Sequence, residues 1–224
     1  MVEGRGLIAE ALAAGWRMEA QVVAPGGEPV LDPSFAPVYL LAPNVIERVA
    51  STESPQPVLA VFELRPMLLP AAPDFVVVAD RLSDPGNAGT IIRSAEAAGA
   101  QAVVLTPGSV DPFNPKVVRS SAGSLFRLPV ASASIDVLRT LGLRVLATSS
   151  HRGDVYTEVD LTGPVAMLVG NEAHGVADNE PVDGWVTIPQ AGAAESLNVA
   201  MAATLLAFEV ARQRRLPPAT PRFT

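Results

Sequence analysis

The chain has 224 residues and a net charge of −7, with no cysteine and two histidines. This length accommodates one large domain, or one of about 150 residues with a smaller companion. The lack of cysteine excludes thiolate chemistry and iron–sulfur clusters, and two histidines argue against a His-rich metal site. The acidic balance argues against a broad nucleic-acid-binding surface, so a polyanion has to be met by a local basic patch.

No apolar run approaches the roughly 18 residues that cross a bilayer. The opening "MVEGRGLIAEALAAGW" lacks the continuous apolar core of a signal peptide. We therefore expect a soluble, cytoplasmic protein without membrane contact and without a metal.

Residues 1–64 are predicted to form a small α/β domain. A helical segment, "GLIAEALAAGW", is followed by extended runs at 20–24, 37–41 and 57–62, with a second helix near 43–51. Residues 65–73 are predicted to be a linker, because Pro66, Pro70 and Pro73 cannot continue a helix or a central strand.

Residues 74–224 are predicted to form the second domain. Apolar strands alternate there with amphipathic helices, which indicates an α/β fold with a mostly parallel sheet covered on both faces. Such sheets bind ligands at the loops that leave the carboxyl ends of the strands. Three of those loops, at 80–87, 170–175 and 189–198, are the polar ones.

The first polar loop lies in "DRLSDPGNAGTIIRSAEAAG". It does not match the G-x-G-x-x-G dinucleotide fingerprint, which disfavours a nucleotide-dependent oxidoreductase. Asn87 and Arg93 stand near a positive helix end and together suit a phosphate or a developing oxyanion. The alternative is an Asx turn at Asn87 and a surface pair between Arg93 and Glu96.

The second polar loop, "LVGNEAHGV", carries glycines that would let a ligand approach the backbone, or it is a tight turn with a solvated Glu172. The third lies in "IPQAGAAESLNVAMAATLLAFE", where Ser196 and Asn198 are candidate helix N-caps. From Val199 to Ala211 the only charge is Glu209. This helix is therefore expected to be covered on more than one side, in part by a partner subunit.

These three segments, in this order, resemble the motifs of the SpoU or TrmH-like branch of the SPOUT RNA methyltransferases. The resemblance implies a C-terminal trefoil knot, bent S-adenosylmethionine in a slot of three loops, and a homodimer with each site near the interface. The N-terminal "VEGRGLIAEALAAG" is similar to the ribosomal-protein-like substrate-binding domain of rRNA-modifying members, without its first strand.

Matched by position, the resemblance implies two groups of site residues. The catalytic and RNA-handling residues are Asn87, Arg93, Glu172, Ser196 and Asn198. The cofactor-binding residues are Thr148, Gly170, Asn171, Gly175, Ile188, Pro189 and Leu197. Two positions depart from the family pattern, Ala173 in place of a glycine and Ala200 in place of a serine, and the methyl group of Ala173 is expected to narrow the slot.

The implied reaction is S-adenosylmethionine-dependent methylation of a ribose 2′-hydroxyl in structured RNA. An arginine is a poor base, so Arg93 is expected to hold a phosphate and stabilise the alkoxide, while Glu172 braces the loops. A local basic patch is expected to contact the RNA, and it consists of Lys116, Arg119, Arg127 and Arg152. The alternative is that these residues belong to an ordinary solvated loop.

The extra N-terminal domain favours rRNA over tRNA as the substrate. Two alternatives stay open at this point. The first is a tRNA 2′-O-methyltransferase. The second is a catalytically silent knotted module that binds RNA or the cofactor. The acidic net charge and Ala173 favour this second alternative.

Overall fold

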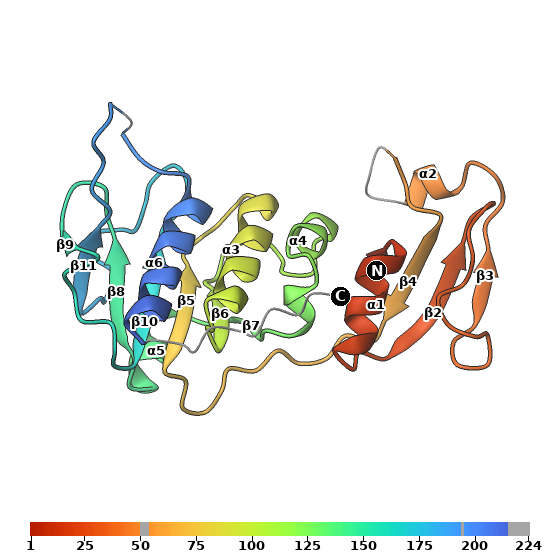
Figure 1. Cartoon of the computed structure of the whole chain (residues 1–224), viewed down its shortest axis with the longest axis horizontal. Helices are drawn as coiled ribbons and strands as arrows, with labels where there is room; N and C mark the ends of the chain where they lie inside the picture. The colour runs from red at the N-terminus through yellow and green to blue at the C-terminus, as the bar shows by residue number, and fades with distance from the viewer. Residues whose placement is uncertain (50–53, 194, 215–224) are drawn as a thin grey trace.

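The computed structural model describes residues 1–49, 54–193 and 195–214. Three predicted segments extend outside these ranges: the last two residues of the helix near 43–51, Ala194 of the third motif, and 215–224 of the second domain. Two sheets lie side by side along the long axis of the molecule, and residues 63–74 join them without a helix or strand (Figure 1).

The N-terminal unit has a four-stranded sheet in the order β1-β4-β2-β3. Its elements are β1 (Val2–Glu3), α1 (Arg5–Ala13), β2 (Met18–Val23), β3 (Val38–Leu40), α2 (Ile46–Val49) and β4 (Val58–Phe62). The expectation of a missing first strand is wrong, because β1 pairs antiparallel with β4. Two residues are too few for a periodic pattern. Helix α2 begins later than predicted, since Asn44 has a left-handed φ of 68°.

The second sheet has seven strands, all parallel, in the order β7-β6-β5-β10-β8-β11-β9. The strands are β5 (Phe75–Ala79), β6 (Ala102–Leu105), β7 (Val130–Ser132), β8 (Arg144–Thr148), β9 (Asp154–Val155), β10 (Val165–Val169) and β11 (Gly184–Thr187). The two-residue strand β9 was not predicted. The mostly parallel sheet expected from the alternating elements is present.

Helices cover both faces of this sheet (Figure 1). One face carries α3 (Pro85–Ala97), α4 (Pro115–Ser120), the short 3-10 helix η1 (Ser124–Phe126) and α6 (Val199–Gln213), and the other carries α5 (Ile135–Thr140). Along β5, Val77 packs toward α3 and α6 whereas Val76 and Val78 pack toward α5. This alternation explains why the strands read as continuous apolar runs.

Close packing of α3 on α4 depends on Gly89. A Cβ atom at this position would lie 1.9 Å from Oγ of Ser120, so any side chain would push the two helices apart. The packing matters for the site because α3 begins beside the polar loops.

Helix α6 buries one side only within the chain. Ala203, Leu206 and Val210 are buried in the core, whereas Met201 and Phe208 are 50% and 48% exposed. The predicted cover on a second side is therefore absent from the single chain, at least among the residues that the structure describes. An exposed apolar strip along a helix is typical of a surface that another molecule covers.

The two units share one continuous core. The indole Nε1 of Trp16 donates to the carbonyl of Phe126 at 2.9 Å, and the two rings meet edge to face with centroids 5.5 Å apart. Arg65 stacks over Trp16 and donates to the same carbonyl at 3.3 Å. Arg127 binds the carboxylates of Glu10 on α1 and Glu96 on α3.

Candidate active site

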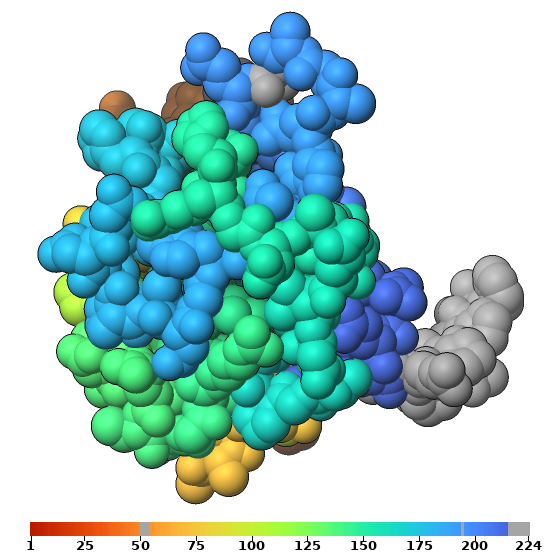
Figure 2. Space-filling model, turned by 90° about the vertical axis from the view of Figure 1, so that its left-hand side faces the viewer, coloured from red at the N-terminus to blue at the C-terminus, as the bar shows by residue number. Residues whose placement is uncertain are grey.

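A cavity of about 650 Å³ opens at the carboxyl ends of β8, β10 and β11. Three chain segments form most of its wall, residues 148–152, 169–176 and 195–199. Figure 2 looks onto this side of the molecule, with the loop before α6 rising at the top. Six predicted cofactor residues line the cavity: Thr148, Gly170, Asn171, Gly175, Ile188 and Leu197. The seventh, Pro189, is not among the lining residues, although its neighbour Gln190 is.

The cavity wall corrects one feature of the predicted slot. The segment after β8, residues 148–152, takes the place expected for the loop at 80–87. Strand β8 lies between β10 and β11, so its end meets the ends of both neighbours. Sequence reasoning therefore missed Ser149, Ser150 and His151 as wall residues, since chain order alone does not give the order of strands in the sheet.

The loop after β10 closes on itself at Gly170. A Cβ atom at this position would lie 2.0 Å from the carbonyl carbon of Gly175, so only glycine fits. Asn171 stabilises the turn with its side-chain oxygen, which accepts from the backbone N–H of Ala173 at 2.9 Å. The closest approach in this loop is thus between Gly170 and Gly175 and not at Ala173, where the slot was expected to narrow.

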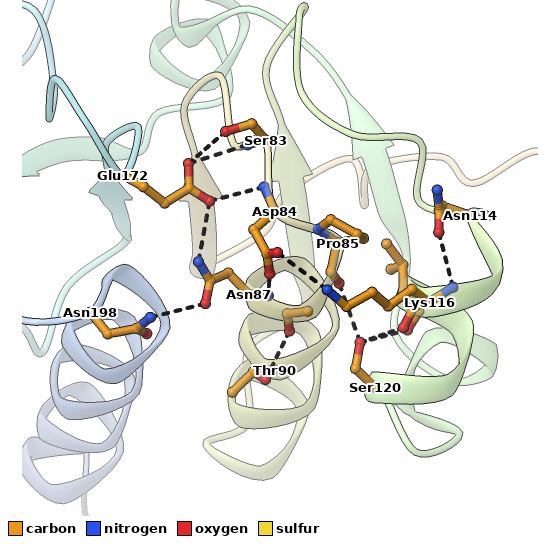
Figure 3. A network of polar contacts seen from close by, with 12 residues as sticks. Ser83, Asp84, Pro85, Asn87, Thr90, Asn114, Lys116, Ser120, Glu172 and Asn198 are labelled. Carbon is orange, nitrogen blue, oxygen red and sulfur yellow. Dashed lines mark hydrogen bonds and ion pairs between the residues drawn. The ribbon is translucent and has the colours of Figure 1, made fainter. Parts of the chain in front are cut away.

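Glu172 joins the loop after β10 to the start of α3 (Figure 3). One carboxylate oxygen accepts from the hydroxyl of Ser83 at 2.9 Å. The other accepts from the backbone N–H of Asp84 at 3.0 Å and from the side-chain amide of Asn87 at 3.2 Å. The loops are braced as expected of this residue, and the alternative of a purely solvated Glu172 is wrong.

These contacts hold Glu172 in its ionised form. Partial burial opposes ionisation, but hydrogen bonds from the backbone of Asp84 and of Glu172 itself and from the side chains of Asn87 and Ser83 outweigh it. Together they lower the pKa of Glu172 to about 2. The carboxylate is consequently an acceptor that orients its neighbours and a very weak base at neutral pH.

Asn87 and Asn198 connect the starts of α3 and α6. The side-chain oxygen of Asn87 accepts from the amide of Asn198 at 3.1 Å (Figure 3). The side-chain oxygen of Asn198 accepts from the backbone N–H of Ala200 at 2.9 Å, so Asn198 is also the N-cap of α6. Ser196 lines the cavity two residues earlier. The Asx turn considered for Asn87 is not formed, since its side chain joins Glu172 and Asn198 instead.

The N-terminus of α3 is already occupied by protein groups. Asp84 caps it by accepting from the backbone N–H of Asn87 at 2.8 Å, and Lys116 lies 3.3 Å from the same carboxylate (Figure 3). Arg93 lies exposed on α3 away from the cavity wall. Its predicted alternative partner, Glu96, binds Arg127. Arg93 thus belongs to the solvent-facing side of the motif.

The four predicted RNA-binding cations do not form one patch. Lys116 and Arg119 lie exposed on α4, whereas Arg127 binds two carboxylates at the junction of the units. Arg152 lies in the cavity wall, with its guanidinium 3.5 Å from the centre of the Trp185 ring and 2.6 Å from Asp178.

Within the described ranges, no cluster of three His, Asp or Glu side chains could hold a metal ion. No helix of the described chain is long and apolar enough to cross a bilayer.

Comparison with known proteins links this geometry to named relatives. The chain is 39% identical over 178 residues to the 23S rRNA (guanosine(2553)-2′-O)-methyltransferase RlmP of Bacillus subtilis, which covers 77% of this chain and 71% of the relative. It is 37% identical over 191 residues to the 23S rRNA (uridine(2479)-2′-O)-methyltransferase of Streptomyces viridochromogenes, covering 78% and 67%.

Solved structures agree with these relatives. The SpoU methyltransferase AviRb from Streptomyces viridochromogenes, in complex with the cofactor AdoMet, superposes with a TM-score of 0.85 at 32% identity, covering 96% of this chain and 89% of that chain. The AdoMet-bound rRNA methyltransferase from Sinorhizobium meliloti gives a TM-score of 0.82 at 34% identity, covering 94% and 86%. The model of the SpoU rRNA methylase family matches residues 74–208. The chain therefore belongs to the SpoU rRNA methylase family.

Proposed function

We propose that this protein transfers the methyl group of S-adenosylmethionine to a ribose 2′-hydroxyl of rRNA. The observation that carries the proposal is the chain of contacts from Glu172 through Asn87 to Asn198, which stands beside the cavity in a member of this family. It brings the three family motifs together at one edge of the sheet.

The cavity suits S-adenosylmethionine in size and chemistry. Its volume of about 650 Å³ is within the range of small-molecule sites, and its wall mixes apolar residues such as Ile188 and Leu197 with polar ones such as Ser149 and Asn171. The cofactor would supply an electrophilic methyl group on a sulfonium. The residues proposed to hold it are Thr148, Gly170, Asn171, Gly175, Ile188 and Leu197, with Pro189 acting through the position of its neighbours.

The polar residues beside the cavity are proposed to align the ribose. Correct placement of the reacting atoms can supply about 7 to 11 kcal/mol of the barrier. Ser196 and Asn198 orient the hydroxyl, and Glu172 keeps Asn87 and the loop after β10 in position. Arg93, which lies exposed outside the cavity wall, is proposed to hold a phosphate of the RNA and to stabilise the emerging alkoxide from the solvent side.

We also propose a homodimer, roles for the two domains and a trefoil knot, all of which the family resemblance implies, and a set of RNA contacts. The exposed apolar side of α6 supports a homodimer in which each site lies near the interface. We further propose that residues 1–64 bind the RNA substrate, that 65–73 are a linker, and that 74–224 form a catalytic domain with a trefoil knot. For RNA contact we propose Lys116, Arg119 and Arg152, with Arg127 restricted by its two carboxylates. A cytoplasmic location follows from an rRNA substrate.

The choice of rRNA over tRNA rests on coverage. The rRNA methyltransferase from Sinorhizobium meliloti covers 94% of this chain. A TrmH/SpoU tRNA modifying enzyme from A. aeolicus covers 63% of it with a TM-score of 0.54. We infer that the N-terminal unit accounts for the difference, since the family model matches only residues 74–208.

Incubation with S-adenosylmethionine labelled on the methyl group tests the proposal. Total ribosomal RNA and, separately, total tRNA serve as acceptors, and alkali-resistant linkages mark 2′-O-methylation. We expect label in 23S rRNA. Label in tRNA alone would replace the substrate, and measurable cofactor binding without transfer to either RNA would support the silent binding module.

Arg93→Ala is expected to reduce transfer by at least about 100-fold and to leave cofactor binding unchanged by calorimetry. Arg139→Ala is the matched control, because Arg139 is an exposed arginine outside the cavity that pairs with Asp183. Loss of cofactor binding in Arg93→Ala would contradict the role assigned to this residue.

A further inference from the structure

Gln190 follows β11 and lines the cavity. It lies within the third motif segment, but it is not among the site residues assigned above. Its side-chain oxygen Oε1 is buried, and within residues 1–49, 54–193 and 195–214 no group donates a hydrogen bond to it. It is the one buried side-chain polar atom of the described chain in this condition.

A buried carbonyl oxygen without a donor is costly, and native proteins pair nearly all such atoms. The cation that lines the same cavity is directed elsewhere, since Arg152 stacks on Trp185 and binds Asp178. Oε1 is itself shielded from the cavity, so the side chain has to turn before a donor carried by a bound ligand can satisfy it. Because Gln190 lines the cavity, it is in that way a candidate contact for the molecule that fills it.

Among the hydrogen-bond donors of the cofactor, the adenine ring suits the Gln190 carboxamide better than the ammonium group does. An ammonium group is better matched by the carboxylates of the wall, Glu172, Asp178 and Glu195. A carboxamide presents an acceptor and a donor side by side, the arrangement with which glutamine reads the amino group and adjacent ring nitrogen of adenine. Ile188 and Val176 supply apolar contacts for a flat ring in the same wall.

We propose that Gln190 recognises the adenine of the cofactor through its side chain. Oε1 accepts from the exocyclic 6-amino group, and the side-chain NH₂ donates to the neighbouring ring nitrogen. This inference rests on the proposed function, because it assumes an adenosine-containing cofactor. It adds a residue that selects the base, apart from the residues that handle RNA.

Calorimetry with two ligands tests the contact without any turnover. The probes are S-adenosylhomocysteine and its 6-deamino analogue, which lacks only the amino donor. The wild-type protein is expected to bind the amino form about tenfold more tightly, the effect of one hydrogen bond. In Gln190→Met, which keeps the length of the side chain and removes both polar groups, this preference is expected to fall below about twofold.

Gln101→Met is the matched control. Gln101 has the same side chain but lies outside the cavity wall, where its oxygen accepts the backbone N–H of Asp74, so this variant should keep the tenfold preference. A full preference for the amino form in Gln190→Met would overturn the proposal, because other groups would then read the base. If Gln190→Met does not fold, as judged by circular dichroism, Gln190→Asn withdraws the carboxamide and carries the same expectation.

The failure of the proposed function has a different signature. A wild-type protein that binds neither ligand has no adenosine site, and both proposals then fall. A wild-type protein that binds both ligands equally retains the cofactor assignment and loses only the role of Gln190.

Discussion

Glu172 and Asn198 each serve two structural purposes. Glu172 accepts from groups on two sides of the first motif loop, and Asn198 caps α6 while it donates to Asn87. Because Glu172 and Asn198 each bind groups near to them and far from them in the sequence, the N-termini of α3 and α6 are fixed relative to the loop after β10. The site is thereby pre-organised before any ligand arrives.

Glu172→Gln is expected to lower the melting temperature at pH 7 by about 2–4 °C, which corresponds to about 1 kcal/mol in a chain of this size. The side-chain amide of the glutamine would place an N–H donor against the N–H and O–H groups that donate to the carboxylate in the wild type. Since folding lowers the pKa of Glu172 from 4.5 to about 2, its stabilisation is complete above pH 4.5 and is lost as the pH falls toward 2.

The difference in melting temperature between wild type and Glu172→Gln should accordingly shrink between pH 4.5 and pH 2, as measured by circular dichroism. Glu158→Gln, an exposed position after β9, is the control and should leave the melting temperature unchanged. An equal difference at both ends of this pH range would refute the linkage to the carboxylate.

At the scale of elements, α6 combines an anchored start with an apolar side that the chain leaves exposed. Leu205 is 42% exposed and lies between Met201 and Phe208 along this side. The buried side of the same helix packs on β10 and α3. An interface on α6 would therefore act directly on the helix that carries Asn198 at its N-terminus.

Leu205→Arg is expected to convert the proposed dimer to a monomer in sedimentation velocity, because a charge would be buried in an apolar interface. The monomer should also lose most methyl transfer if the site needs its partner. Val137→Arg on α5, at a position with a similar exposure of 40%, is the control and should remain dimeric. A wild-type monomer would exclude the composite site.

Long periodic elements could be predicted from the sequence, and short or non-local ones could not. The apolar run from Val199 and the cap at Asn198 identify α6 within two residues of its observed end. Strands β1 and β9 have two residues each and exist only through their pairing partners. The acceptors and donors around Glu172 were equally hidden, because Ser83 lies 89 residues away and its contact depends on the order β5-β10 in the sheet.

The motifs predicted two of the three segments that enclose the cavity, the loop after β10 and the loop before α6, but not the segment after β8. Thr148 was identified by position alone, and the wall that follows it has ordinary serines and a histidine without a distinctive spacing. Only the placement of β8 between β10 and β11 brings that segment to the cavity.

At the scale of the whole molecule, the two units are joined by a buried, packed interface as well as by the linker. Trp16 is 4% exposed and contacts Phe126, Phe113 and the guanidinium of Arg65. The predicted linker carries the chain across, but the contacts of Trp16 with Phe126 of η1 and of β1 with α4 set the orientation. We therefore expect both units to unfold together.

Trp16→Ala tests this cooperativity. Removal of a buried tryptophan costs about 3–5 kcal/mol, and here it also leaves the carbonyl of Phe126 without one of its donors. Calorimetry should give one transition for the wild type and a lower or divided transition for the variant. Tyr39→Ala, an aromatic position that is 59% exposed, should leave the single transition in place. Two separate transitions in the wild type would contradict the shared core.

The shared core also limits how this architecture can be recombined. Glu10 presses against Gly123, where a Cβ atom would lie 2.9 Å from its side chain, and Arg127 spans both units. An N-terminal unit grafted from a relative would have to match the surface of residues 121–128 as well as the linker. Exchange of N-terminal units should succeed only when η1 and its flanking residues are exchanged together with the unit.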